Sequence, residues 1–122
     1  GGGVPKLLST LKLQLINGVI GELYLKNIIT FPGQNKSLIH LKGRVGNLRG
    51  KTSVPIANLP TELVPSENYP ISWYQPSNDD FSKVGIYVNA EQKCVWLSFT
   101  GGGPSNLLVD LNSWYVVDHE IK

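Results

Sequence analysis

The sequence predicts an all-β domain, an antiparallel β-sandwich of jelly-roll-like type with about eight or nine strands. Thirteen glycines and eight prolines separate short apolar runs along the chain. No segment keeps apolar residues at the i, i+3, i+4 and i+7 spacing of an amphipathic helix. By contrast, the residues from Leu38 to Gly46 alternate with a period of two, which is typical of a strand in an antiparallel sheet.

The chain has 122 residues, the size of one domain. Residues 1–10 are expected to be a linker or a remnant of cloning, because the chain opens with three glycines. Residues 11–122 are expected to form a single β-sandwich head domain. Because a natural start leaves a methionine and this sequence has none, we expect a piece of a longer protein.

The first predicted strands are Leu11–Ile16 and Val19–Leu25, joined by Asn17-Gly18, the strongest short hairpin signal. The later strands are expected in short steps, separated by turn residues. In order they are Asn27–Phe31, Leu38–Gly46, Thr52–Asn58, Tyr69–Tyr74, Val84–Val88, Cys94–Phe99, Leu107–Leu111 and Ser113–Val117.

The strand Leu38–Gly46 has two distinct faces. One face carries Ile39, Leu41, Gly43 and Val45, and the other carries Leu38, His40, Lys42 and Arg44. After the following strand, Pro60 and Pro65 fix the backbone and remove two hydrogen-bond donors. The segment Leu59–Pro65 is therefore predicted to be a corner at which the sheet ladder stops.

The composition excludes several classes of partner. The net charge is +2, and the basic residues of the chain form no stripe. Both observations argue against a nucleic-acid partner. No apolar run approaches about 18 residues, so membrane insertion is not expected. The charged fraction is only 16%, which suggests that a partner covers part of the surface. The single cysteine, Cys94, is expected to be a small core residue.

No arrangement of residues indicates catalysis, a metal or a cofactor. The two histidines lie far apart in sequence, and no zinc-ligand spacing occurs. Asp79-Asp80 lacks the alternating acidic residues of a calcium loop, and the other carboxylates are isolated. Gly101-Gly102-Gly103-Pro104 lacks the Lys-Ser/Thr pair and the helix of a phosphate-binding loop.

Aromatic residues are the most informative candidates for binding. Adjacent residues of a strand face opposite sides, so one of Trp73 and Tyr74, and one of Trp114 and Tyr115, must point away from the core. An outward aromatic ring can stack on a sugar while nearby polar groups bind its hydroxyls. The predicted saccharide-binding residues are Trp73, Tyr74, Gln75, Asn78, Asp79, Asp80 and Trp114. A subunit interface is the alternative explanation of the same aromatics.

The order of several predicted elements resembles the order found in a known class of proteins. Leu41-Lys42-Gly43-Arg44-Val45 is followed by a short strand ending in Leu59-Pro60 and then by a proline-containing link. This resembles head domains of tailed-bacteriophage tail fibres, baseplate proteins and receptor-binding proteins, over roughly residues Ile28 to Val117. The chain departs from the pattern at Thr61-Glu62-Leu63, where such proteins usually place a glycine.

The resemblance implies a non-catalytic viral protein at the tail tip or baseplate of a virion, and hence outside the host cell. It implies a homotrimeric jelly-roll head that recognises a host cell-wall saccharide and serves host adhesion, or one that holds another baseplate or tail protein. A structural baseplate or fibre-attachment domain without glycan binding therefore remains an alternative. Two further alternatives are a carbohydrate-binding module of a secreted hydrolase and a trimeric head similar to tumour necrosis factor.

Overall fold

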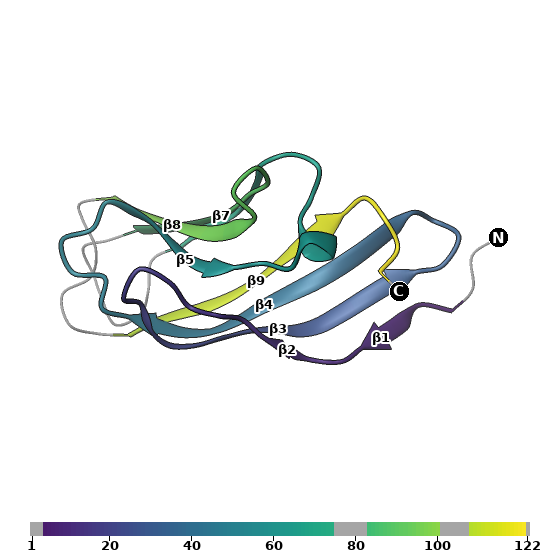
Figure 1. The fold of residues 1–122 in the computed structure, drawn as a ribbon, viewed down its shortest axis with the longest axis horizontal. Coiled ribbons are helices and arrows are strands. Elements are labelled where there is room, and N and C mark those ends of the chain that lie inside the picture. Colours follow the sequence, from purple (N-terminus) through teal and green to yellow (C-terminus); the bar gives the residue numbers. More distant parts are fainter. Residues whose placement is uncertain (1–3, 75–82, 101–107, 122) are drawn as a thin grey trace.

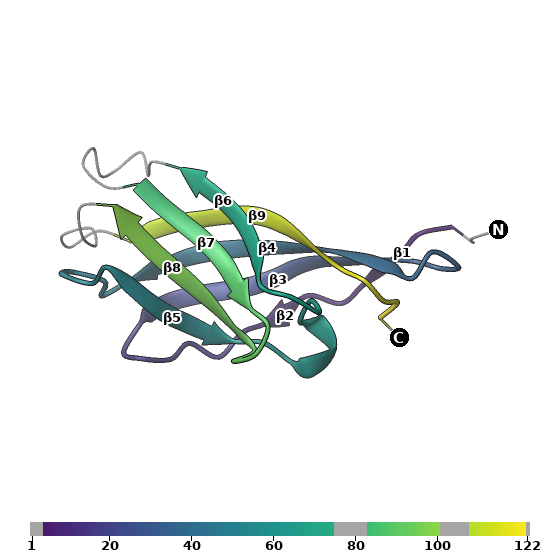
Figure 2. The same ribbon diagram turned by 90° about the horizontal axis from the view of Figure 1, so that it is seen from above.

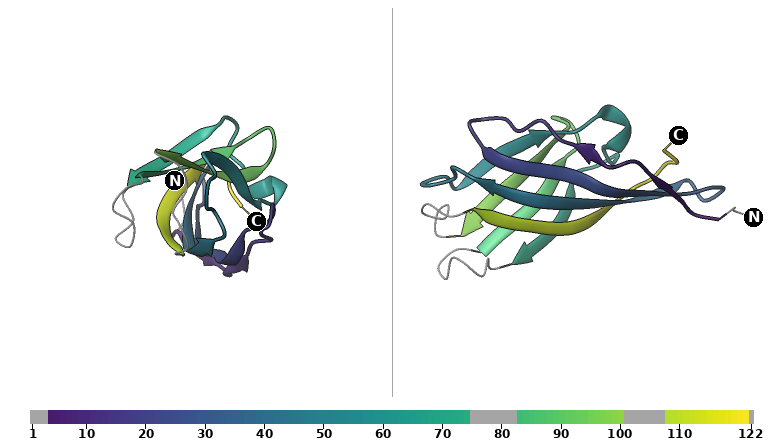
Figure 3. Two further views of the ribbon diagram at one scale, coloured as in Figure 1. Left: turned by 90° about the vertical axis from the view of Figure 1, so that its left-hand side faces the viewer. Right: turned by 90° about the horizontal axis from the view of Figure 1, so that it is seen from below.

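The computed structural model describes residues 4–74, 83–100 and 108–121 and shows two packed antiparallel sheets (Figure 1). The end-on view in Figure 3 separates the two layers. Within the described ranges, the one helical element is a short 3-10 turn, η1 (Thr61–Leu63). The predicted all-β sandwich is therefore confirmed. No helix in this part of the chain is long and apolar enough to cross a membrane.

The first sheet has the strand order β1-β3-β4-β9, and β2 also pairs with β3. All of its pairs are antiparallel. Its strands are β1 (Lys6–Leu8), β2 (Leu11–Lys12), β3 (Ile20–Phe31), β4 (Lys36–Gly46) and β9 (Val109–Val117). Seen from below in Figure 3, this sheet forms one long surface.

The second sheet has the strand order β5-β8-β7-β6 and lies diagonally across the first (Figure 2). Three strands joined by hairpins, with β5 returning beside β8, make a Greek key, the unit from which jelly rolls are built. Its strands are β5 (Ser53–Asn58), β6 (Tyr69–Tyr74), β7 (Lys83–Asn89) and β8 (Cys94–Thr100).

The core lies between the two sheets. Ile39, Leu41 and Val45 are fully buried, as the alternation along β4 predicts. The second sheet contributes buried side chains such as Ile86 and Leu97. Burial of each such side chain contributes roughly 1.5–3 kcal/mol to folding. The second sheet covers only one side of the first sheet. We call the opposite side of the first sheet its outer face, and it remains available for polar residues.

Strand β3 is one strand of 12 residues, whereas the sequence predicts two strands in this region. The register shifts between Leu25 and Asn27, so the chain makes a bulge at Lys26. Before the bulge Leu23 and Leu25 are buried, and after it Ile28 is buried. The extra residue keeps both apolar sets in the core, and it is the reason why the alternation looks broken in the sequence.

Strand β9 is also continuous, although the sequence predicts two strands, Leu107–Leu111 and Ser113–Val117. Its buried positions alternate from Val109 to Val117 without a break. Ser113 occupies one of them, and this polar residue interrupts the apolar pattern that the sequence shows. Leu107 lies outside the described residues.

The predicted turn at Asn17-Gly18 is confirmed. Both residues have positive φ, 57° and 73°, and the amide of Val19 donates to the carbonyl of Ile16 at 3.1 Å. Two successive positive φ angles are characteristic of the type I′ hairpin turn.

The strand predicted before this turn, Leu11–Ile16, is only partly correct. Its first two residues form β2, whereas Leu15 makes an isolated bridge with Ala57 of β5 in the other sheet. The amide of Ile16 likewise donates to the carbonyl of Ile56 at 2.9 Å. The segment therefore crosses from one sheet to the other and closes a side of the sandwich, a course that no local pattern in the sequence encodes.

Both ends of the described chain contact the first sheet. Lys6–Leu8, within the stretch predicted to be a linker, forms β1 and pairs with β3. After β9 the chain turns back over the β3–β4 hairpin, where the hydroxyl of Ser37 donates to the carbonyl of His119 at 2.8 Å. The amide of Ile121 donates to the hydroxyl of Thr30 at 3.3 Å. These bonds satisfy buried polar groups and have a structural role.

Candidate functional site

The structure divides the predicted saccharide-binding residues between the two sheets. Trp73 and Tyr74 lie at the end of β6, opposite Gly85 and Val84 of β7. Trp114 lies on β9 of the first sheet, a strand that β6 contacts. The remaining predicted residues, Gln75, Asn78, Asp79 and Asp80, lie outside the described residues. Of the predicted set, Trp114 is thus the residue whose side-chain surroundings the structure describes.

Trp114 and Tyr115 face opposite sides, as predicted for adjacent aromatics of a strand. Tyr115 is 0% exposed in the core, whereas Trp114 is 41% exposed on the outer face of the first sheet. Burial raises the pKa of the Tyr115 hydroxyl well above its usual range. Trp114 is therefore the outward aromatic that the sequence could not distinguish from its neighbour.

The outer face around Trp114 consists of rows of residues that lie side by side on β3, β4 and β9. Three consecutive rows are polar or aromatic, and we call them the central band. From one end they are Glu22–Arg44–Asp110, Tyr24–Lys42–Asn112 and Asn27–His40–Trp114.

Apolar residues border the central band at both ends. Beyond Asn27–His40–Trp114 lies the row Ile29–Leu38–Val116, which Leu7 of β1 extends. At the other end Ile20 and Leu108 approach each other over Gly46, where a Cβ would lie 2.5 Å from Leu108 Cδ2. The outer face is therefore polar at its centre and apolar at its two ends.

The imidazole of His40 fixes the position of Trp114. The two rings stack with centroids 4.3 Å apart and planes 5° from parallel. His40 Nδ1 lies 3.1 Å from Asn27 Nδ2, and His40 Nε2 lies 2.5 Å from Asn112 Oδ1. With the amides in these orientations, Nδ1 accepts a hydrogen bond from Asn27 and Nε2 donates one to Asn112. Three strands thus hold one rigid aromatic pair.

Charges in the central band are largely paired with one another. The guanidinium of Arg44 donates to both carboxylate oxygens of Asp110, at 2.6 and 3.3 Å, and this raises the pKa of Arg44. The hydroxyl of Tyr24 donates to Glu22 at 2.9 Å, and this hydrogen bond raises the pKa of Tyr24. Lys12 forms a second ion pair with Glu22 at 3.6 Å. The band therefore offers many polar groups with little net charge.

The outward face of the second sheet carries another aromatic pair. Tyr87 and Trp96 are register partners on β7 and β8, with ring centroids 5.8 Å apart and planes 20° from parallel. The indole nitrogen of Trp96 donates to Gln92 Oε1 at 3.0 Å. Trp96 is less exposed than Trp114, and its ring nitrogen is already bonded within the chain. This pair is therefore the weaker candidate for ligand contact.

Other titratable groups that the structure describes, among them His119 and Cys94, lie outside the central band. Among the described residues, no group of three or more His, Cys, Asp or Glu residues could hold a metal. His119 Nε2 lies 2.5 Å from the carbonyl oxygen of Glu62, far along the chain. Cys94 is buried, as predicted, and burial raises the pKa of its thiol, which disfavours the reactive thiolate.

Sequence reasoning missed most of the central band. The polar face of Leu38–Gly46 was recognised, but its neighbours Asn27 and Asn112 are distant in sequence and only strand register places them beside His40. Comparison with protein-family models, with curated proteins and with solved structures found no match.

Proposed function

We propose that this domain is a non-catalytic saccharide-binding head and that it binds through the central band. The observation that supports this most directly is the side chain of Trp114. One face of its indole stacks on His40, and the residue as a whole is 41% exposed. A flat, rigid aromatic surface with amide groups beside it suits a sugar ring, which has an apolar C–H face and hydroxyls at its edge.

The distribution of polarity favours a sugar over a protein partner. Protein interfaces usually have an apolar centre with a polar rim. The outer face has the reverse arrangement, because the central band is polar and the apolar rows lie at its ends. The amides of Asn27 and Asn112 each use one group on His40 and keep further hydrogen-bonding capacity for hydroxyls.

The carboxylates of the central band support binding rather than hydrolysis. Glu22 and Asp110 lie on β3 and β9, two strands apart, which corresponds to about 9.5 Å between their backbones. Arg44 lies between them and pairs with Asp110, while Glu22 accepts from Tyr24. Both groups are therefore engaged as acceptors within the chain, unlike a general acid that must donate a proton.

The setting that we propose is a tailed-phage tail fibre or baseplate, with the domain as a homotrimeric receptor-binding head on the virion. The resemblance of Leu41–Val45 and Leu59-Pro60 to such heads motivates this part of the proposal. Trimerisation on a fibre tip would also compensate for shallow sites, because several weak contacts with one cell wall combine into high avidity. The ligand would then be a host cell-wall saccharide.

The test is binding of the purified domain to an array of bacterial surface polysaccharides. We expect Trp114→Ala to lose binding by about tenfold or more, because the stacking surface is removed. Trp96→Ala is the matched control, since it removes a stacked tryptophan from the opposite outward face. Loss of binding in the control alone would move the site to the second sheet. A wild-type domain that binds no polysaccharide would refute the proposed function.

A structural role in the baseplate is the second candidate, and two exposed apolar side chains favour it. Leu7 is 66% exposed and Ile20 is 57% exposed, at opposite ends of the outer face. Such residues suit contact with a neighbouring protein. Light scattering combined with a cell-wall binding assay separates these functions. A trimer that binds supports the adhesin, and a trimer that does not bind supports the structural role. A monomer that binds supports a carbohydrate-binding module.

A further inference from the structure

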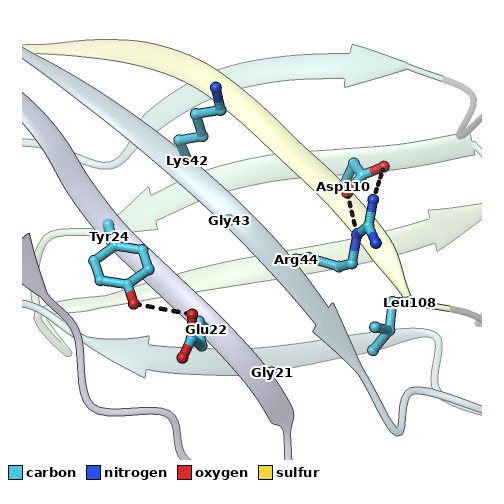
Figure 4. A pocket seen from close by; sticks show the side chains of 8 residues that line it. All are labelled: Gly21, Glu22, Tyr24, Lys42, Gly43, Arg44, Leu108 and Asp110. Carbon is cyan, nitrogen blue, oxygen red and sulfur yellow. Dashed lines mark hydrogen bonds and ion pairs between the residues drawn. The ribbon is translucent and has the colours of Figure 1, made fainter.

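The outer face of the first sheet contains a hollow at the end of the central band that lies away from Trp114. Its volume is about 400 Å³, within the range of small-ligand sites. Figure 4 shows that residues from β3, β4 and the start of β9 surround it. Tyr24 and Leu108 supply apolar walls, and Glu22, Lys42, Arg44 and Asp110 supply polar groups.

Gly43, between Lys42 and Arg44, is one of two glycines that line the hollow. A Cβ on Gly43 would lie 2.1 Å from the carbonyl oxygen of Glu22, so β3 and β4 approach too closely for any side chain there. The same holds for Gly21, whose Cβ would lie 2.1 Å from the carbonyl oxygen of Arg44. The backbone of Gly21 and Gly43 forms part of the lining of the hollow.

The charges around the hollow suit an uncharged, polyhydroxylated ligand. Two cations, Lys42 and Arg44, are balanced by two carboxylates, Glu22 and Asp110. No ion pair joins Lys42 to a carboxylate among the described residues, so its ammonium group can donate to a ligand oxygen. A hydroxyl both donates and accepts, and it can therefore use either kind of group. A phosphate or a nucleic acid would meet repulsion from the two carboxylates.

The hollow and Trp114 are too far apart for a single sugar ring. Tyr24 lies in the row Tyr24–Lys42–Asn112, and Trp114 is two residues beyond Asn112 on β9. Two strand spacings and two residues along the strand give a separation of about 12 Å. Lys42 and Asn112 provide polar groups along the diagonal between the two places.

We propose that the hollow is a second sugar subsite, and that the domain binds a linear neutral oligosaccharide that runs from Tyr24 across Lys42 to Trp114. This inference rests on the proposed function and specifies its ligand. When both subsites hold units of one chain, the second contact is intramolecular, so the longer ligand gains affinity by effective concentration. The ligand is then distinguished by length as well as by composition.

The test uses size-fractionated hydrolysis products of the neutral polysaccharide that binds best on the array. We expect the long fragments to bind at least about tenfold more tightly than a single sugar unit, in calorimetric titrations. Tyr24→Ala should lower the affinity for long fragments by about tenfold and leave the single-unit affinity unchanged. Trp114→Ala should weaken binding of both. The unchanged single-unit affinity of Tyr24→Ala also shows that this variant folds.

Equal affinity for all fragment lengths would overturn the second subsite and leave the proposed saccharide function intact. The same conclusion would follow if Tyr24→Ala had no effect on long fragments. If the domain bound only charged polysaccharides, and high salt abolished binding, the neutral class of ligand would be refuted. A domain that binds nothing on the array would overturn both proposals.

Discussion

The hydroxyl of Tyr115 donates a 2.9 Å hydrogen bond to the backbone carbonyl of Leu63. This bond joins the inner side of β9 to the turn η1, in the corner predicted at Leu59–Pro65. Pro60 and Pro65 of this corner have no amide proton, whereas the amides of Leu59, Leu63 and Val64 donate to backbone carbonyls. A buried side chain from the far end of the sequence therefore holds the corner against the first sheet.

Replacing this tyrosine tests the role of the bond in stability. In Tyr115→Phe the ring remains but the carbonyl of Leu63 loses its partner in a buried setting. We expect the free energy of unfolding to fall by about 1–3 kcal/mol, as measured by urea denaturation. Saccharide affinity should not change, because Tyr115 lies on the inner side of the sheet. An unchanged stability would mean that water replaces the bond.

Stability should fall at alkaline pH. Burial raises the pKa of Tyr115 in the folded protein, whereas tyrosine in the unfolded chain titrates near pH ~10. The folded state then holds the proton more tightly, so its stabilisation is complete below about pH 10 and is lost as the pH rises further. Cys94, whose pKa burial also raises, adds to this trend from about pH 8.5.

The same variant isolates the tyrosine contribution to this pH dependence. Chemical denaturation of the wild type and of Tyr115→Phe should be compared between neutral pH and about pH 11. We expect the stability advantage of the wild type to shrink above about pH 10. Parallel curves over the whole interval would assign the alkaline loss to other groups.

Gly43 should tolerate no side chain. In Gly43→Ala the new Cβ would meet the carbonyl oxygen of Glu22 at 2.1 Å, and backbone on both strands must shift. We expect a loss of stability at or above the upper end of the ~1–3 kcal/mol typical of overpacking. Gly50→Ala is the control, because its Cβ meets nothing within 4 Å and only its φ of 74° is unfavourable. Similar losses in both variants would contradict the close approach of β3 and β4.

His40 should act on saccharide binding through Trp114. His40→Ala removes the stacked partner of the indole together with both amide contacts, and we expect affinity to fall by about two- to tenfold. His40→Phe restores a stacked ring without the hydrogen bonds and should recover part of the loss. Fluorescence of Trp114 and titration with the array polysaccharide provide the two measurements. An unchanged saccharide affinity of His40→Ala would exclude this positioning role.

Local sequence patterns predicted the elements well where inward-facing apolar residues alternated cleanly with outward-facing ones. The alternation in β4 placed Ile39, Leu41 and Val45 in the core, and positive φ at Asn17-Gly18 matched the expected turn. Prediction was weaker where the tertiary structure alters a local rule. The bulge at Lys26 made one long strand look like two, since it shifts the face on which apolar residues must lie.

The candidate site was predicted only in part for a related reason. Trp114 was among the predicted residues, but the pattern could not tell which of Trp114 and Tyr115 faces outward, because both are aromatic and both fit either side of a strand. The partners of Trp114 were not predicted at all. His40, on β4, is 74 positions away in the chain, and only the register of β4 with β9 makes the two residues neighbours.

The sequence by itself determined the class of fold, because the period of two, the turn residues and the absence of helical spacing are local properties of the chain. The tertiary structure decided which residues share the outer face. Strand order and register are set by the burial of the whole core, since a slip of one residue would expose every buried side chain of a strand. The stacked pair of Trp114 and His40 and the hollow near Gly43 are consequences of that register.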